Sequence, residues 1–283
     1  MSITTTEQTI ARPSLPHVNA PLNYLAPMAE RPHNYTYDPP PGVPRSNIAA
    51  ETHVVPIYSA RPFAADASLD RAGFALLHRQ SAVRDFYDDD EVRRVYYPEA
   101  ERVLTEATGA KRVFVFDHTV RRRVQGIEDR AAGTPRQPVG RVHIDHTEKS
   151  GPQRVRDFLG AEADQWLRGR MQVINLWRPI RGPLRDAPLA VCDALSVAPE
   201  DLVTSDLIYR DRVGETYAVR FNPNHRWFYV PDMQPDEALL LKCYDSATDG
   251  RARFAPHTAF EDPTVGPDVL PRESIELRTF VFH

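Results

Sequence analysis

The sequence contains one His-x-Asp tripeptide, His143-Ile144-Asp145. The surrounding segment PVGRVHIDHT has the composition of a β-strand, and side chains two positions apart on a strand project from the same face. Both side chains could therefore reach one ion. With ten histidines in the chain, about one His-x-Asp is expected by chance. The tripeptide thus predicts a metal site only if a third ligand and a co-substrate anchor accompany it.

The third ligand must come from a distant strand, and three histidines in distant downstream segments are candidates. His257 lies in the short predicted strand FAPHTAF, His225 lies beside aromatic residues in NPNHRWFYVP, and His283 ends the chain. We favour His257, because an arginine suited to a co-substrate follows it. Two histidines and one carboxylate on one face of iron(II) leave positions open for a co-substrate and dioxygen. A hydrogen-bonded structural histidine is the alternative interpretation.

The arginine follows His257 at 272 − 257 = 15 positions. Its planar guanidinium can bind the distal carboxylate of 2-oxoglutarate through two hydrogen bonds, while the 2-oxo acid end chelates the iron. Arg272, Ser274 and Arg278 face the same way along the predicted strand. Ser274 could add a hydroxyl donor, and Arg278 is the second candidate for the carboxylate. Alternatively, Arg272 pairs with a neighbouring glutamate on the surface.

Further polar and aromatic residues lie on predicted strands that could border the same cavity. His118 could equally be structural, and core packing is the alternative for Trp177 and Trp227. Asn175 is predicted to contact the co-substrate. The predicted substrate contacts are His118, Trp177, Arg178, His225 and Trp227.

Composition argues against several other classes of protein. The net charge is −4 and the triple-arginine run at 121–123 is typical of a solvated face, so no nucleic-acid partner is expected. No Gly-rich loop for dinucleotides or phosphates occurs. No apolar run approaches the roughly 18 residues of a membrane span, and the N-terminus lacks the order of a signal peptide. Cys192 and Cys243 lie in apolar stretches, which predicts buried free thiols and a cytoplasmic protein.

The elements that must position these residues follow from the spacing of apolar side chains. Residues 1–50 are rich in proline, so we expect them to lie extended along the surface without forming a core element. The first dozen residues are expected to be disordered. No internal repeat or linker is visible, which predicts a single oxygenase domain over 1–283.

Three helices are predicted. Helical spacing indicates one over 70–86, with Asp70 as its N-cap, and another over 90–108, with Asp90 as its N-cap. A third begins at Ser150, where Ser150 and Gln153 fit the capping-box pattern.

Strand signals dominate the rest of the chain. Alternating residues predict a strand over 111–120, a loop over 124–138 and the strand that carries His143. From Met171 onward, short apolar segments alternate with turn residues, which predicts a mainly β fold with flanking helices and a double-stranded β-helix (jelly-roll) core. The interior of such a core can hold a small molecule. The segments are MQVINLWRPI, PLAVCDAL, DLVTSDLIY, ETYAVRFN, RWFYVP, ALLLKCYDS, FAPHTAF and SIELRTFVF.

From about Phe114 to the C-terminus, the chain resembles the CmcJ-like and AsaB-like hydroxylase/desaturases, a family related to a gibberellin desaturase. Together the blocks that carry the resemblance are far more specific than His-x-Asp alone. They are VHIDHT (142–147), INLWRPIRGPLRDAPLAVCDA (174–194), NHRWFYVPDMQPDEALLLKCYDS (224–246), ARFAPHTAFEDP (252–263) and RESIELR (272–278).

The resemblance implies an oxygenase of specialised metabolism that uses iron(II), 2-oxoglutarate and dioxygen to hydroxylate or desaturate a small molecule. It implies His143, Asp145 and His257 as iron ligands and an arginine of RESIELR as the 2-oxoglutarate anchor. Two alternatives are an iron dioxygenase that does not use 2-oxoglutarate and a non-catalytic accessory subunit of the same fold.

Overall fold

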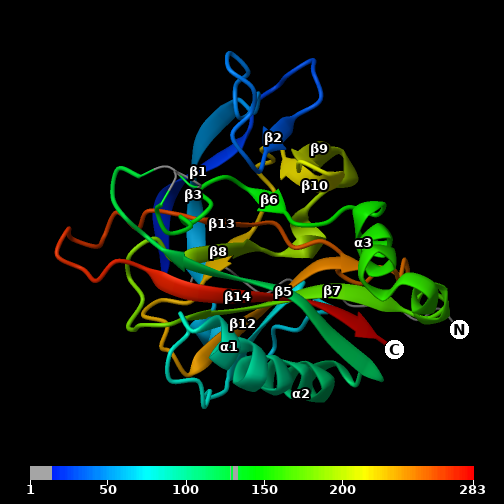
Figure 1. Cartoon of the computed structure of the whole chain (residues 1–283). Helices are drawn as coiled ribbons and strands as arrows, with labels where there is room; N and C mark the ends of the chain where they lie inside the picture. Colours follow the sequence, from blue (N-terminus) through cyan, green and yellow to red (C-terminus); the bar gives the residue numbers. More distant parts are fainter. Residues whose placement is uncertain (1–14, 128, 130–132) are drawn as a thin grey trace, which may run out of the picture.

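The computed structural model describes residues 15–127, 129 and 133–283. The expectation of a disordered first dozen residues therefore lies outside the described residues. Two facing sheets form the core of the described chain (Figure 1). The larger has the order β1 (His17–Leu25), β3 (Ala50–Ser59), β11 (Trp227–Tyr229), β8 (Leu189–Cys192), β13 (His257–Ala259), β6 (His143–Ile144), β10 (Val213–Val219), β9 (Leu202–Ile208) and β2 (His33–Tyr35).

The smaller sheet is antiparallel throughout and lies across the interior from β6, β8 and β13. Apolar residues of both sheets pack between them, among them Leu189 and Val191 from the larger sheet and Trp177 and Leu239 from the smaller. This architecture confirms the predicted mainly β fold with a jelly-roll core and flanking helices. The order of the smaller sheet is β4 (Phe74–His78), β12 (Glu237–Asp245), β7 (Met171–Pro179), β14 (Glu273–Phe282) and β5 (Arg112–Arg122).

A continuous helical segment covers the outer face of the smaller sheet, as Figure 1 shows. It comprises α1 (Asp89–Glu91), a π-helical turn over Val92–Tyr96 and α2 (Tyr97–Thr108). The predicted helix over 90–108 is confirmed, although Asp88 rather than Asp90 is its N-cap. The wider π turn precedes Pro98, whose missing N–H would interrupt a regular helix.

The helix predicted from Ser150 is also confirmed, as α3 (Ser150–Leu159), but its capping box is wrong. Thr147 Oγ1 accepts hydrogen bonds from the backbone N–H groups of Lys149 and Ser150, and the Gln153 side chain donates to Asp157 instead. The remaining helices in the described part of the chain are short: α4 (Ala163–Leu167) and 3-10 turns at Arg61–Phe63, Gly160–Glu162, Ala194–Ser196 and Pro199–Asp201.

The predicted helix over 70–86 is wrong, because residues Phe74–His78 form the edge strand β4. Phe74 and Leu76 pack into the cluster around Trp177, whereas Ala75 and Leu77 pack toward α2 on the opposite face. A strand that is covered on both faces carries a continuous apolar run, which resembles helical spacing over a short window. Asp70 caps no helix and instead pairs with Lys242, Arg170 and Arg251.

The N-terminal segment also differs from expectation, since β1 is a core strand. Val18, Ala20, Leu22 and Tyr24 alternate inward and are buried, while β1 pairs with β3 along its whole length. Pro21 is tolerated because β1 is an edge strand. The other predicted strands are present, although β6 contains only two residues. Both cysteines are free and buried, as predicted. No helix in the described ranges has the length and apolar character needed to cross a bilayer.

The Lys242 ammonium is completely buried and joins three segments of the chain. It donates to Asp70 and Asp245, at 2.7 Å each, and to the Ala252 carbonyl at 3.0 Å. These bonds join β12 to the segments that precede β4 and β13. The position of β13, which carries His257, therefore depends in part on this buried cation.

We expect Lys242→Met to lower the free energy of unfolding by about 3 kcal/mol, because it leaves the buried Asp245 carboxylate with less compensating charge. Urea unfolding measures this change, with Lys111→Met as a control at an exposed lysine. Equal stability of the two variants would show that the Lys242 cluster does not stabilise the fold.

Candidate metal centre

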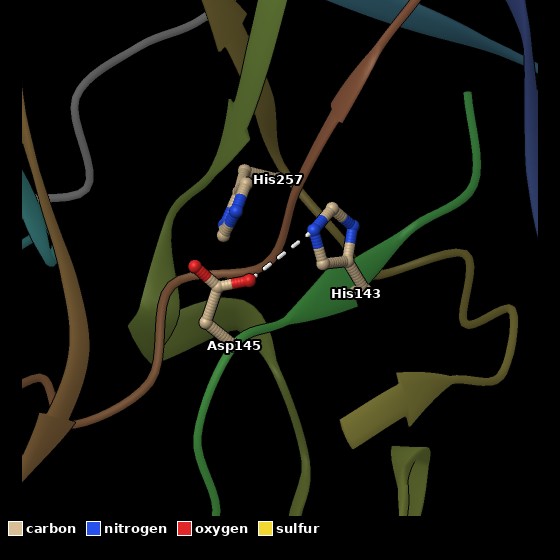
Figure 2. A group of neighbouring side chains, drawn as sticks. All are labelled: His143, Asp145 and His257. Carbon is tan, nitrogen blue, oxygen red and sulfur yellow. Dashed lines mark ion pairs between the residues drawn. The ribbon is translucent and has the colours of Figure 1, made fainter. Parts of the chain in front are cut away.

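Strand pairing brings His143 and His257 together. β6 and β13 are neighbours in the larger sheet, and His143 is the direct antiparallel partner of His257. Side chains of such a pair lie on the same face, and the two imidazole rings are 4.4 Å apart between centroids. Val142 and Ile144 alternate to the opposite side and are buried in the core. Asp145, two residues beyond His143, therefore points to the same face as both histidines (Figure 2).

One potential ligand atom from each of His143, Asp145 and His257 lies within 4.8 Å of the other two. His143 Nε2 is 3.6 Å from Asp145 Oδ1. His143 Nδ1 donates to the Arg141 carbonyl at 2.9 Å and His257 Nδ1 donates to the Ala255 carbonyl at 3.2 Å. Because carbonyls only accept, the protons are on Nδ1 and the Nε2 lone pairs are free for a metal. Two imidazoles and a carboxylate fit the donor set of a non-haem iron(II) site.

The electrostatics of the site favour metal-binding protonation states. Burial, with a contribution from His257, lowers the pKa of His143 to about 3, so its imidazole is neutral near pH 7. Burial opposes ionisation of Asp145, yet the Arg278 guanidinium helps to hold the pKa of this carboxyl well below its usual range. A metal can therefore bind His143 and Asp145 without displacing a proton from either.

Arg278 and Asn175 orient the Asp145 carboxylate. Asp145 Oδ2 accepts hydrogen bonds from Arg278 Nε at 3.1 Å and Asn175 Nδ2 at 2.8 Å. Arg278 also pairs with Glu276 at 2.6 Å and contacts the Thr119 hydroxyl at 3.1 Å. Its guanidinium is thus occupied by protein groups, which argues against Arg278 as the carboxylate anchor. Partners of this kind tune a metal site by fixing the ligand.

Arg272 has a different environment. It is buried, and its Nε and Nη1 atoms donate to Ser274 Oγ at 3.1 Å and the Ala187 carbonyl at 2.8 Å. The guanidinium carbon lies 4.9 Å from the ring centroid of Trp177. Among the described residues, Arg272 has no ion pair with a carboxylate within 4 Å. Arg272 and Trp177 line a small cavity together with His143, Asp145 and His257.

Arg121 is a residue that the sequence interpretation missed. The triple-arginine run was expected to form a solvated face, yet Arg121 is buried and donates to the Gln137 carbonyl at 2.7 Å. It borders both the small cavity and the larger one beside it. The alternation of side chains along β5 could have predicted this orientation. Arg121 lies two positions after Thr119, and the two residues pair with Ser274 and Glu276 of β14 on the same face of the sheet.

Three predicted substrate contacts lie elsewhere in the fold. Arg178 lies on the outer face of β7, with its guanidinium carbon 5.0 Å from the ring centroid of Tyr96. His225 contacts Asp201 at 3.0 Å, and Trp227 Nε1 donates to Tyr24 Oη at 2.6 Å within the packed core. These positions do not support the predicted substrate contacts of Arg178, His225 and Trp227.

His118 lies between the larger cavity and the helical layer. It borders the larger cavity, but its ring nitrogens contact Tyr97 Oη at 2.9 Å and Asp89 Oδ1 at 3.2 Å. Its β14 partner Leu277 packs toward α2, so the imidazole belongs to the helix side of β5. The contacts of its ring are therefore structural.

The fold and the His-Asp-His group together fit the class of mononuclear non-haem metal oxygenases. A family model described as an oxidoreductase/YMDC permease-like domain matches residues 22–282. A hydroxylase/desaturase of Hormonema carpetanum is 35% identical over 94% of this chain and 95% of its own length. An alpha-ketoglutarate-dependent dioxygenase of a fungal species is 36% identical over 76% of this chain and 79% of its own length.

The structural comparison agrees. A variant of the iron and alpha-ketoglutarate-dependent endoperoxidase NvfI superposes with a TM-score of 0.86 and 27% identity, covering 94% of this chain and 97% of that one. The chain belongs to the hydroxylase/desaturase family of Fe(II)/2-oxoglutarate-dependent dioxygenases. The fold, the cofactor class and the family expected from the sequence are thereby confirmed.

The two candidate histidines give a direct test of the ligand set. Loss of even an outer partner of a metal ligand costs about 10- to 100-fold in metal affinity. His257→Ala should weaken Mn(II) binding, measured by calorimetric titration, by more than this factor. His225→Ala is the matched control and should leave Mn(II) affinity unchanged. Weaker binding in His225→Ala alone would contradict the assignment.

Proposed function

We propose that His143, Asp145 and His257 bind iron(II) and that Arg272 binds the distal carboxylate of 2-oxoglutarate. The observation that carries the second assignment is the contrast between the two arginines. Arg278 is neutralised by carboxylates, whereas among the described residues the Arg272 guanidinium donates only to a hydroxyl and a carbonyl, and it borders the small cavity beside the predicted ligands. A guanidinium that keeps its charge toward a cavity favours a carboxylate there.

When bound, iron(II) and 2-oxoglutarate activate dioxygen for removal of a hydrogen atom from a substrate C–H bond. The residues of the chain hold the metal ligands and the co-substrate anchor in position. Arg278 and Asn175 hold Asp145 in position, and the two backbone carbonyls fix the histidine rings. Ser274 helps to orient Arg272. The cavity beside His143 and Asp145, of about 810 Å³, has room for a small-molecule substrate.

The reaction we propose is hydroxylation or desaturation of a specialised metabolite. The name hydroxylase/desaturase belongs to relatives such as the Hormonema carpetanum protein, which spans almost the whole chain. We further propose that the chain works as a single domain in the cytoplasm, because the buried free thiols of Cys192 and Cys243 suit a reducing compartment.

The reaction class can be tested before the substrate is known. With iron(II), 2-oxoglutarate and dioxygen, we expect slow conversion of 2-oxoglutarate to succinate and CO2, measured by chromatography. His143→Ala should abolish this conversion because it removes a metal ligand. If iron(II) binds but 2-oxoglutarate is neither bound nor consumed, a dioxygenase independent of 2-oxoglutarate is the better assignment.

Substitutions of Arg272 and Arg278 should have different effects on ligand binding. Arg272→Met should weaken 2-oxoglutarate binding to the Mn(II)-loaded protein by about 10- to 100-fold, the value of a lost charge-assisted hydrogen bond. Its Mn(II) affinity should stay the same. Arg278→Met should instead weaken Mn(II) binding, because Asp145 loses its positioning partner. Calorimetric titrations measure both affinities, and the opposite pattern would make Arg278 the anchor.

A further inference from the structure

The cavity of about 810 Å³ beside the metal ligands carries an excess of positive charge. Three aspartates, Asp117, Asp129 and Asp145, contribute to its lining, so the formal balance is 6 − 3 = +3. Apolar side chains, among them Phe116, Val139 and Leu207, form other parts of the wall. The six arginines are Arg45, Arg121, Arg136, Arg141, Arg154 and Arg278.

Four of these arginines are largely occupied by the protein itself. Arg136 makes a bidentate pair with Asp129 at 2.9 and 3.0 Å. Arg278 pairs with Asp145 and Glu276, and Arg121 lies 4.0 Å from the Asp129 carboxylate and donates to the Gln137 carbonyl. Arg154 lies over the Phe158 ring at 4.5 Å and is 3.6 Å from Asp157. Arginines with such partners hold the wall of the cavity in place, and their charge is not free to bind a ligand.

Arg141 differs from these four. Its side chain makes no ion pair or hydrogen bond among the residues that the structure describes, although it is only partly exposed. It lies two positions before His143, and the buried Val142 and Ile144 fix the alternation of the segment. The same alternation that directs His143 and Asp145 into the site therefore directs Arg141 to the cavity.

Arg45 supplies a second unsatisfied donor at this cavity. One of its terminal nitrogens pairs with Asp38, whereas the other, Nη1, is buried and has no hydrogen-bond partner in the described part of the chain. Buried donors of this kind normally have a partner, whether protein, water or ligand. The cavity thus has two guanidinium groups with free hydrogen-bonding capacity.

We infer that the primary substrate combines an apolar skeleton with a carboxylate, and that Arg141 binds this carboxylate. The inference deepens the proposed function and rests on it, since it concerns the substrate of the same site. A guanidinium fork satisfies both oxygens of a carboxylate, and the apolar wall accommodates the rest of the molecule. Because Arg141 precedes the ligand His143 by two residues, anchoring there holds the skeleton next to the metal.

The 2-oxoglutarate carboxylate is the competing occupant of Arg141. It is disfavoured because Arg272 already offers a guanidinium in the small cavity that contains all three predicted ligands, whereas Arg141 borders only the larger one. The two cavities share His143 and Asp145, so each of them borders the predicted metal position.

The test uses the full chain loaded with Mn(II) and 2-oxoglutarate. The probes are pyrenebutyrate and its neutral primary amide, which differ in charge but hardly in size. Fluorescence anisotropy gives both dissociation constants. Wild type should bind the acid at least about ten times more tightly than the amide, which corresponds to one charge-assisted hydrogen bond. Arg141→Gln should remove this preference and leave the affinity for the amide unchanged.

Arg84→Gln is the matched control, because it makes the same change in net charge at a side chain that is 89% exposed. It should keep the preference for the acid. If Arg141→Gln does not fold, Arg141→Lys decides: its preference should fall because an ammonium lacks the planar fork. An unchanged preference in that variant would overturn the assignment.

Three further results would overturn the inference. These are equal binding of acid and amide by wild type, a full preference in Arg141→Gln, and loss of 2-oxoglutarate binding in Arg141→Gln without loss of the probe. Failure of wild type to bind Mn(II) or 2-oxoglutarate would refute the proposed function instead. The acid–amide comparison, repeated on the unloaded protein, would then still decide whether the cavity selects a carboxylate.

Discussion

The antiparallel pairing of His143 with His257 is the constraint on which the metal site depends. β6 has two residues and β13 has three, so their register is fixed by their neighbours β10 and β8 rather than by their own length. A slip of one residue would turn one histidine to the opposite face of the sheet. The core residues Val142 and Ile144 oppose such a slip, because it would expose them to the cavity.

The charge of the Asp145 carboxylate needs compensation inside the fold, and side chains of β7 and β14 provide it. Asn175, Glu276 and Arg278 form a polar network on strands that are otherwise largely apolar. Asn175 Oδ1 has no hydrogen-bond partner among the described residues, although it is buried beside Asp145. An unsatisfied acceptor at this point is consistent with a site that holds polar groups beyond the protein's own.

Much of the fold follows from local sequence, and the exceptions have a common cause. β5 was predicted because its segment alternates apolar and polar residues and is rich in β-branched and aromatic side chains, although both of its faces are covered. β4 is covered on both faces, so its apolar run imitated a helix, and the prolines around β1 hid the alternation of Val18, Ala20, Leu22 and Tyr24. Which faces of a strand are covered depends on tertiary packing, and this cannot be predicted from the sequence of the strand alone.

The same reasoning separates the site residues that could be predicted from those that could not. His143 and Asp145 are two positions apart on one strand, so their common direction follows from geometry alone. Arg272 and Arg278 also share a face, and spacing cannot distinguish them. Their roles diverge because Arg278 faces carboxylates, whereas Arg272 faces a hydroxyl and a carbonyl. The same holds for Arg121, Arg141 and Arg178. The role of each arginine depends on the groups that the fold places around it, and in this chain those groups come from distant strands.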